Sequence, residues 1–295
     1  MNIKKYLDNL EDFQDKKVLV TGGTSGIGLS IVKHLLYKRA KVVVLARNQN
    51  KSNEVKNKLL EIYPDNPIEI IEYDQSSKES IIAASQEIIA KHLDFYALVM
   101  NAGIFQSKKS FTYTNDVPET INTNFIGLKI LLDNLLDKLE GEHRFIFQGS
   151  LVASWHDKRI KTLQDKNLSS FQRYIISKSG VECLFYHYVN YGNPNFHFVL
   201  VEPGITNSEI IRDYPTPIRQ MGHVFLKVAS HSVEKAALTA LKGLESTTED
   251  NTFIVPRGLF TCMGYPKFKK FPHKRERTYL YQLLGNLEDV MGENH

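Results

Sequence analysis

Short apolar runs alternate with longer amphipathic segments over most of the 295-residue chain. Seven runs are rich in Val, Ile and Phe and are bounded by polar or turn residues, as is typical of buried strands. These predicted strands are Lys17–Val20, Lys41–Leu45, Ile68–Tyr73, Phe95–Met100, Arg144–Gln148, Phe196–Val201 and Thr252–Val255. Six segments have apolar residues at helical spacing. These predicted helices are Ile27–Tyr37, Asn53–Ile62, Lys78–Lys91, Glu119–Leu139, Tyr174–Tyr191 and Ser232–Leu244. The alternation predicts right-handed crossovers, and hence a doubly wound α/β fold whose mostly parallel sheet of about seven strands has helices on both faces.

The same pattern indicates one domain with an extension at each end. Residues 1–16 carry apolar side chains at helical spacing, which predicts a short amphipathic helix that packs on the domain, with membrane contact or dimerisation as the alternative. Residues 17–256 form the predicted domain, and residues 257–295 a C-terminal extension that we interpret as a cover on the substrate side. Two long segments, 151–173 and 207–230, interrupt the alternation and are expected to be binding loops or lids.

Composition narrows the class of protein. The net charge of +4 is small and its basic residues are spread along the chain, so nucleic-acid binding is not expected. Cys183 and Cys262 lie in no metal-ligand spacing, which argues against a disulfide framework or a zinc site. The polar N-terminus and the absence of a long apolar run favour a cytoplasmic protein without a signal peptide or transmembrane segment.

A glycine-rich turn joins the first predicted strand to the first helix of the alternation. Gly22 permits the tight turn, Gly26 lets the backbone approach a pyrophosphate, and Gly28 lets helix and strand pack closely. The N-terminus of the following helix then offers free N–H groups and a partial positive charge to the anion. The sequence therefore predicts a dinucleotide site. Its expected contacts in this turn are Thr21, Gly22, Thr24, Ser25, Gly26, Ile27 and Gly28.

The end of the second strand bears on the choice of cofactor. An NAD-specific site typically has an acidic residue there for the ribose 2′-hydroxyl, whereas this chain has Ala46 followed by Arg47. A guanidinium binds a 2′-phosphate through charge-assisted hydrogen bonds, and a carboxylate would repel it. Arg47 therefore favours NADP(H), with NAD(H) as the alternative, unless Arg47 is only a solvated loop charge.

Tyr174 and Lys178 are four residues apart, which places both on one face of a helix. A phenol normally titrates near pH 10, and a neighbouring ammonium lowers its pKa toward the working range of a general acid or base. The pair is therefore a candidate catalytic unit, although a surface helix explains most such matches by themselves.

Taken together, these motifs resemble the short-chain dehydrogenase/reductase family from about Lys16 to Leu244. The family's elements occur in its order along the chain. They are Thr21-Gly22 with Gly26-Ile27-Gly28, Asn101-Ala102-Gly103, Asn124, Ser150, Tyr174 with Lys178, and Pro203-Gly204. The resemblance implies a Rossmann-type fold and an enzyme that moves a hydride between a nicotinamide and a carbonyl or alcohol carbon.

The resemblance also assigns roles to four catalytic residues. Tyr174 would exchange a proton with the substrate oxygen, and Ser150 would hydrogen-bond that oxygen. Lys178 would lower the pKa of Tyr174 and hold the nicotinamide ribose. Asn124 would anchor a water that links Lys178 to solvent.

Further positions would line the cofactor. The resemblance places Asn101, Ala102 and Gly103 beside it after the fourth strand, Asp74 against the adenine, and Pro203-Gly204 after the sixth strand.

Several positions depart from the family's common pattern. Gly149 stands where a first serine is usual, Gln75 follows Asp74 where an apolar residue is usual, and Ser25 stands where some NADP-preferring members have a basic residue. The segment between Ser150 and Tyr174 is longer than in most members and resembles the branch of retinol dehydrogenases and protochlorophyllide reductases. This length and the aromatic tail suggest a lipophilic substrate.

Other functions fit the sequence less well. Ser150 is not in a Gly-x-Ser-x-Gly elbow, which argues against a hydrolase, and the histidines form no metal-binding motif. A non-catalytic NADP(H)-binding sensor or interaction protein on the same fold is the main alternative, because a fold alone does not establish activity. Exposed faces of the 119–139 and 174–191 helices could pair in a homodimer.

Overall fold

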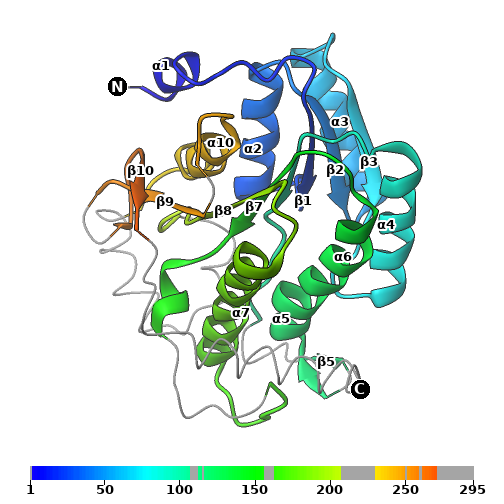
Figure 1. The fold of residues 1–295 in the computed structure, drawn as a ribbon, viewed down its shortest axis with the longest axis vertical. Coiled ribbons are helices and arrows are strands. Elements are labelled where there is room, and N and C mark those ends of the chain that lie inside the picture. Colours follow the sequence, from blue (N-terminus) through cyan, green and yellow to red (C-terminus); the bar gives the residue numbers. More distant parts are fainter. Residues whose placement is uncertain are drawn as a thin grey trace.

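The computed structural model describes residues 2–106, 112–114, 116–155, 163–206, 230–249, 251–258 and 261–270. Within them lies an eight-stranded sheet in the order β10-β9-β8-β7-β4-β1-β2-β3 (Figure 1). Its strands are β1 (Lys17–Thr21), β2 (Lys41–Ala46), β3 (Ile68–Glu72), β4 (Ala97–Met100), β7 (His143–Gln148), β8 (Phe196–Val201), β9 (Thr252–Pro256) and β10 (Pro266–Lys269). A separate hairpin pairs β5 (Tyr113–Thr114) with β6 (Val117–Pro118).

Helical segments connect the strands. In the described residues they are α1 (Ile3–Asp8), α2 (Gly26–Tyr37), α3 (Gln49–Ile62), α4 (Lys78–Lys91), α5 (Glu119–Ile121), η2 (Asn122–Ile126), α6 (Gly127–Leu135), η3 (Leu136–Lys138), η4 (Leu151–Trp155), α7 (Ser170–Tyr191), α9 (Val233–Ala236) and α10 (Leu238–Leu244). Helices α1, α4 and α7 begin with side-chain caps from Asn2, Ser77 and Ser169. Such caps satisfy backbone N–H groups that have no partner inside the helix.

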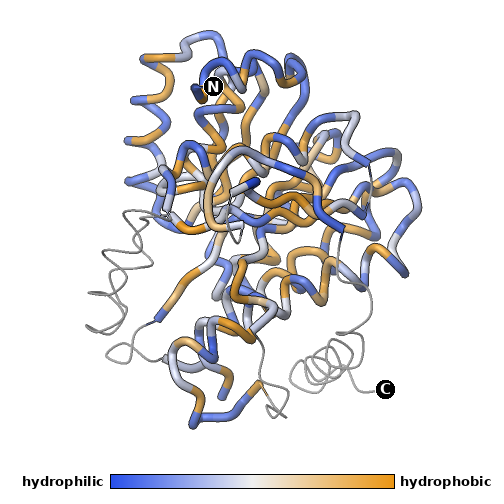
Figure 2. The backbone as a smooth tube through the Cα atoms, turned by 90° about the vertical axis from the view of Figure 1, so that its left-hand side faces the viewer, coloured by the Kyte–Doolittle hydropathy of each residue, from blue (hydrophilic) through white to orange (hydrophobic). Residues whose placement is uncertain are grey.

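Helices cover both faces of the sheet because alternate strand residues point to opposite sides. Leu19 of β1 belongs to a core that includes residues of α4, α6 and α7. Val18 and Val20 belong to a second core, with residues of α1, α2 and α10. Figure 2 shows hydrophobic residues concentrated along the central strands. The predicted doubly wound α/β fold is therefore confirmed.

The strand order predicts a crevice at the carboxyl ends of the central strands. β1 pairs in parallel with β2 on one side and with β4 on the other, so the chain leaves these neighbouring strands in opposite directions. Ligands of open α/β sheets bind where this reversal occurs. The loops after β1, β4, β7 and β8 are therefore the expected walls of a site.

The sheet has one strand more than the seven predicted. β10 runs antiparallel to β9, with Phe268 opposite Ile254, and comes from the segment interpreted as a cover. Pro266 is the only buried residue of this strand, so no apolar run marks it in the sequence. Residues 259–260 and 271–295 of the predicted extension lie outside the described residues.

The predicted helical segment over Glu119–Leu139 is confirmed from Glu119 to Lys138, but it is not one regular α-helix. The segment is divided into α5, the π-helical η2, α6 and the 3₁₀ turn η3. A π turn holds one residue more than an α turn. Nearly every residue from Thr120 to Leu132 is buried, so no polar face shows where this extra residue lies.

Helix α7 differs from the expectation of an exposed pairing face. Every residue from Arg173 to Tyr186 is buried within one chain. A homodimer through this helix stays a prediction, but the exposed face on which it was based is absent from Arg173 to Tyr186.

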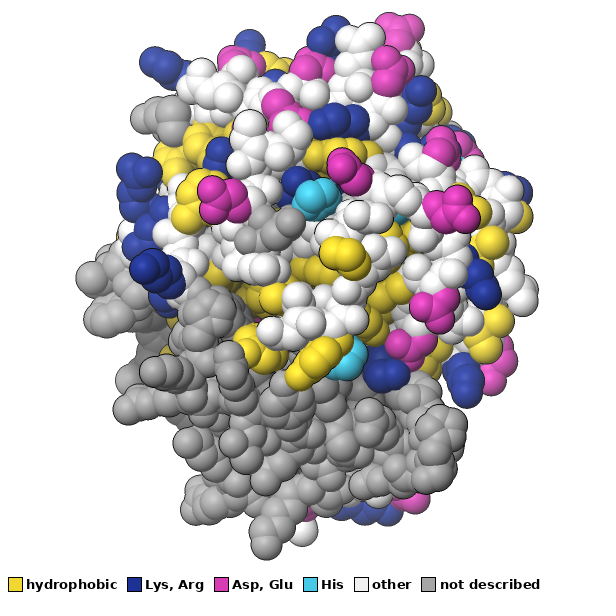
Figure 3. All heavy atoms as spheres, viewed as in Figure 1, with side chains coloured by type: hydrophobic (Ala, Val, Ile, Leu, Met, Phe, Trp, Pro, Cys, Tyr) yellow, Lys and Arg dark blue, Asp and Glu magenta, His cyan; other side chains and the backbone are white. Residues whose placement is uncertain are grey.

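On the described part of the face drawn in Figure 3, acidic and basic side chains are interspersed.

Candidate active site

The glycine-rich turn between β1 and α2 has the backbone that a pyrophosphate site needs. Gly22 and Gly26 have φ values of 70° and 53°, a region that glycine adopts without strain. A Cβ at Gly28 would lie 2.3 Å from the Gly22 oxygen, so α2 packs against the turn only because no side chain is present. Ser25, which precedes α2, makes no side-chain cap. The first N–H groups of this 12-residue helix are therefore left for an anion, and the turn fits the predicted dinucleotide.

Asn101 and Ala102 fix this turn against the neighbouring strands. Asn101 donates from Nδ2 to the Thr21 oxygen at 3.0 Å and accepts at Oδ1 from Gln148 Nε2 at 2.8 Å. Ala102 N–H donates to Thr21 Oγ1 at 2.9 Å. Hydrogen bonds of the predicted cofactor residues thus join the ends of β1, β4 and β7. Gln148 is a residue that the sequence analysis missed.

Arg47 and Asp74 lie at the ends of β2 and β3. Arg47 Nη1 is 3.9 Å from Asp74 Oδ2, and the Arg47 side chain is 73% exposed. Asp74 Oδ1 accepts from the backbone N–H of Ser76 at 3.0 Å and from its hydroxyl at 2.6 Å. The loop after β3 is therefore ordered by Asp74, while the Arg47 guanidinium remains exposed to incoming anions.

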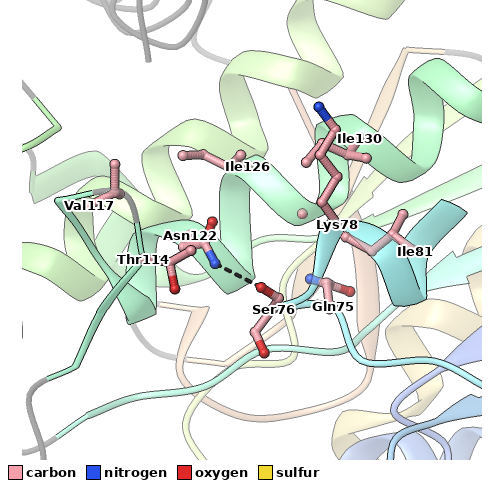
Figure 4. A pocket seen from close by; sticks show the side chains of 10 residues that line it. Gln75, Ser76, Lys78, Ile81, Thr114, Val117, Asn122, Ile126 and Ile130 are labelled. Atoms are coloured by element: carbon pink, nitrogen blue, oxygen red, sulfur yellow. Dashed lines mark hydrogen bonds between the residues drawn. The ribbon is translucent and has the colours of Figure 1, made fainter. Parts of the chain in front are cut away.

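A small pocket lies beside this loop, between α4 and the η2–α6 segment. It measures about 120 Å³, and Figure 4 shows Lys78, Ile81, Asn122 and Ile130 among the side chains around it. Asn122 donates from Nδ2 to the Ser76 oxygen at 3.1 Å, which joins η2 to the loop. The pocket opens next to the loop that Asp74 orders and away from the predicted catalytic residues, which do not line it.

Three of the predicted catalytic and cofactor residues meet at the carboxyl end of β4. A Cβ at Gly103 would lie 3.2 Å from Asn124 Oδ1 and 3.7 Å from Lys178 Nζ. Lys178 Nζ donates to the Gln148 oxygen at 3.0 Å. Tyr174 lies one turn before Lys178 on α7 and is 8% exposed, with Phe105 edge-on at 5.5 Å. The four-residue spacing therefore does place a phenol and an ammonium on one face above this crevice.

Ser150 follows β7, and the segment after it is fixed to the same helix. Gly149 N–H donates to the Val201 oxygen at 2.9 Å, which extends the pairing of β7 and β8. Ser179 of α7 donates from Oγ to the Ala153 oxygen at 2.7 Å. Ser150 thus lies between two anchored points at the amino-terminal part of the long insert.

The ammonium of Lys178 is buried, and burial alone lowers its pKa to about 8. Desolvation disfavours the charged form, and the Gln148 oxygen compensates for only part of the lost hydration. A negative or hydroxylated ligand beside Lys178 would be held more strongly in this setting than in water.

Asn124 uses its side chain within the protein. Oδ1 accepts from Ile104 N–H at 2.7 Å, and Nδ2 donates to the Ile104 oxygen at 2.9 Å and to Ser177 Oγ at 3.0 Å. Both amide hydrogens are therefore taken. If Asn124 anchors a water, as the resemblance implies, it can do so only through an oxygen.

The Pro203-Gly204 turn after β8 is tied to the hairpin that joins β9 and β10. Gly204 has a φ of 77°, and a Cβ there would lie 2.4 Å from the Cys262 oxygen. Ile205 N–H donates to that oxygen at 2.7 Å, and His231 Nε2 contacts the Pro203 oxygen at 2.6 Å. Nothing in the sequence marks His231 for this position, because its partners are distant along the chain.

Aromatic side chains lie in the segments before and beside Tyr174. Trp155 is 57% exposed, and its ring lies 6.2 Å from that of Phe171 in the first turn of α7. Phe105 borders Tyr174 from the loop after β4. Residues 156–162 and 207–229, which belong to the two expected binding loops, lie outside the described residues.

The sequence profile of the short chain dehydrogenase family matches residues 16–216, more than half of the chain. This chain belongs to the short-chain dehydrogenase family. It is similar to a short-chain dehydrogenase/reductase of Emericella nidulans, with 25% identity over 276 residues that cover 86% of this chain and 87% of the relative.

Other relatives match over a shorter stretch. The chloroplastic short-chain dehydrogenase TIC 32 B of Brassica napus is 32% identical over 45% of this chain and 41% of its own length. Human polyprenol dehydrogenase is 31% identical over 43% of this chain and 38% of its own length. The chain thus spans about two fifths of the length of these relatives.

Solved structures share the fold. A crystal structure of an uncharacterized protein from Mycobacterium Paratuberculosis superposes with a TM-score of 0.74, at 18% identity, over 97% of each chain. Levodione reductase superposes with a TM-score of 0.63, at 20% identity, over 79% of this chain and 91% of its own. In the described residues no helix is both long and apolar enough to cross a membrane.

Proposed function

We propose that this protein is an NADP(H)-dependent oxidoreductase that transfers a hydride between the nicotinamide and a carbonyl or alcohol carbon of a lipophilic substrate. The observation that carries the proposal is the meeting of Gly103, Asn124 and Lys178 at the carboxyl end of β4, with Tyr174 one turn away. Buried polar groups that converge on a crevice beside a dinucleotide-type turn are the arrangement expected of an active site.

Each side chain has a role in the reduction direction. The bound nicotinamide supplies the hydride. The Tyr174 hydroxyl donates a proton to the substrate oxygen, and the Ser150 hydroxyl donates a hydrogen bond to the same oxygen as its charge grows. Lys178 holds positive charge beside Tyr174, which favours the phenolate left after proton transfer. Asn101, Ala102, Pro203 and Gly204 shape the walls of the cofactor crevice.

The test of the reaction is a panel of aldehydes and ketones of increasing apolar size, followed by NADPH absorbance. We expect reduction, with kcat/KM rising with apolar surface, because Trp155, Phe171 and Phe105 offer aromatic contacts near Tyr174. Binding of NADPH without reduction of any compound would favour the non-catalytic sensor. A ranking that favours small polar carbonyls would contradict the lipophilic substrate alone.

NADPH should bind more tightly than NADH because the exposed Arg47 guanidinium is available to a 2′-phosphate. Arg47→Ala should weaken NADPH binding about tenfold or more, the effect of one charge-assisted contact, and leave NADH binding unchanged. Fluorescence titration of both cofactors at fixed ionic strength measures this difference.

The matched control for this test is Arg39→Ala. Arg39 is an exposed arginine too, but it pairs with Asp12 before the amino end of β2. Arg39→Ala should leave the affinities for NADPH and for NADH unchanged. Equal affinity of the wild type for NADPH and NADH would overturn the cofactor preference.

The cytoplasmic location expected from the sequence stays a prediction. One relative in the same family is chloroplastic by name, so membership of the family does not fix the compartment.

A further inference from the structure

Gln75 departs from the apolar residue usual after Asp74, and its buried amide connects three segments around the crevice. The residue is 5% exposed. Its Nε2 donates to the Thr123 oxygen of η2 at 2.7 Å and lies 3.4 Å from the Ala102 oxygen in the loop after β4. Its Oε1 accepts from the Tyr73 hydroxyl at 3.1 Å.

These partners leave one orientation for the amide. Backbone carbonyl oxygens only accept hydrogen bonds, so the NH₂ group must face Thr123 and Ala102. Burial raises the pKa of Tyr73, which keeps its hydroxyl protonated and able to donate to Oε1. An apolar side chain of similar size at position 75 would leave the Thr123 oxygen and the Tyr73 hydroxyl without these partners.

The Thr123 oxygen needs a donor because of the π turn. Gly127 N–H bonds to the Asn122 oxygen, five residues back, and α-helical spacing then resumes in α6. When the bonds again span four residues, the N–H of Leu128 reaches the Asn124 oxygen. The Thr123 oxygen therefore receives no hydrogen bond from within the helix. A buried carbonyl without a partner is unfavourable, and the Gln75 amide fills this vacancy.

Gly127 makes this contact sterically feasible. A Cβ at Gly127 would lie 2.0 Å from the Gln75 oxygen, so the loop after β3 approaches the helix only because this residue has no side chain. The backbone of Gln75 and its amide therefore hold the same helical turn from one side.

The π turn determines where Asn124 points. In this geometry Asn124 bonds to both backbone groups of Ile104 and to Ser177 of α7. Each residue of an α-helix turns the chain by about 100°, so a change from π to α spacing would rotate Asn124 relative to α6 and away from these partners.

We propose that Gln75 is a positioning residue of the hydride-transfer site, which stabilises the π turn η2 and thereby holds Asn124 and the Ala102–Gly103 loop against Lys178. The role rests on the proposed function, because it matters for turnover only if that site carries the reaction. Gln75 itself touches neither substrate nor reacting atoms.

The experiment compares Gln75→Leu with a matched control, Asn66→Leu. Asn66 also donates from one amide to two carbonyl oxygens, those of Leu36 at 3.2 Å and Ala40 at 3.4 Å, but at the amino-terminal edge of the sheet. Both variants lose an amide that donates to two backbone oxygens, and Gln75→Leu also loses the bond from the Tyr73 hydroxyl. A general loss of stability should therefore appear in both variants, whereas an effect on η2 should appear only in Gln75→Leu.

Hydrogen exchange of the ligand-free 295-residue chain gives a readout that needs no substrate. Gln75→Leu should raise exchange about tenfold in peptides covering residues 119–131, as expected for the loss of one buried hydrogen bond, whereas Asn66→Leu should leave those peptides unchanged. Unchanged exchange in Gln75→Leu would overturn the proposal whether or not a substrate is in hand.

Turnover separates positioning from folding. Gln75→Leu should lower kcat about 100-fold, the order of effect of a small misplacement of a catalytic group, with little change in the Kd for NADPH. Asn66→Leu should keep its kcat. Normal kcat in Gln75→Leu, with a wild type that turns over, overturns the role of Gln75 and leaves the proposed function intact.

A third variant tests the donor directly. Gln75→Glu keeps the size of the side chain, but as a carboxylate it offers no hydrogen to the Thr123 oxygen. The protonated carboxyl can donate, so kcat of Gln75→Glu relative to wild type should rise as the pH falls. A ratio that stays constant with pH would show that the hydrogen bond to Thr123 does not position the site.

Discussion

The buried ammonium of Lys178 lowers the free energy of unfolding, because its charge has lost its hydration. Its Nζ donates to the Gln148 oxygen, and its pKa of about 8 lies below the ordinary 10.5 because burial removes water from the ammonium. Between about pH 8 and 10.5 the unfolded chain binds more protons than the folded one. The free energy of unfolding therefore rises with pH across this range. Below about pH 8 the full cost of the buried charge remains.

Lys178→Met should therefore stabilise the ligand-free protein at pH 7, by about 1–3 kcal/mol, although it removes a group that the reaction needs. The gain should shrink between about pH 8 and 10.5, where the wild type becomes more stable. Urea unfolding at about pH 7 and about pH 9.5 measures both effects. Lys58→Met, at an exposed position of α3, should show neither of them. A less stable Lys178→Met at neutral pH would contradict the account of the buried charge.

Single residues were predictable from sequence only where chemistry and spacing coincide. Tyr174 and Lys178 are four apart on a helix, and the approach of Lys178 and Asn124 to Gly103 agrees with the family's order of motifs. Gln148 gave no such signal. Its partners, Asn101 and Lys178, come from other elements, and only the folded sheet brings them together.

At the scale of elements, α2 and η2 show what periodicity can and cannot predict. The glycine pattern before α2 predicted a close approach, and the structure gives it a physical cause in the 2.3 Å between the Gly22 oxygen and a Cβ at Gly28. The π turn of η2 was missed because nearly every residue around it is buried, so no polar face shows the extra residue. Its stabilising contact, the Gln75 amide, lies 48 positions earlier in the chain.

Gly28→Ala should push α2 away from the turn, since the new methyl would also lie 2.5 Å from Asn101 Nδ2. We expect a loss of about 1–3 kcal/mol of stability, typical of overpacking, together with at least about tenfold weaker NADPH binding. Thermal unfolding and NADPH titration measure the two effects.

Gly141→Ala provides the comparison. Gly141 has a φ of 83°, so alanine is strained there, but a Cβ at this position would meet no other atom within 4 Å. The residue also precedes β7, at the far end of the sheet from the turn. Stability should fall while NADPH binding is kept. If Gly28→Ala binds NADPH normally, the turn before α2 is not the phosphate site.

At the scale of the molecule, the N-terminal segment packs against residues that flank the C-terminal strands β9 and β10. Tyr6 of α1 stacks on Tyr265 beside β10, with ring centroids 5.1 Å apart. Glu11 accepts from the Ser246 backbone N–H at 2.6 Å and from its hydroxyl at 2.7 Å. The alternation of strands predicted the layers of the domain, but these contacts join residues more than 200 positions apart and could not be read from local patterns.

Tyr6→Ala should lower the free energy of unfolding by about 2–4 kcal/mol, because it removes a partly buried aromatic ring and its stacking contact with Tyr265. Tyr191→Ala, which truncates a side chain that is 65% exposed, should cost far less. Urea denaturation of both variants provides the comparison. Equal losses would mean that α1 is not part of the cooperative fold.

The proposed reaction is tested most directly by the turnover of Tyr174→Phe on any carbonyl compound that the wild type reduces. The substitution removes the transferable proton and keeps the ring that packs edge-on against Phe105. We predict that kcat falls by at least about 10²–10⁴-fold, the usual contribution of general acid–base catalysis, while the Kd for NADPH stays unchanged. Turnover of Tyr174→Phe at the wild-type rate would contradict the account.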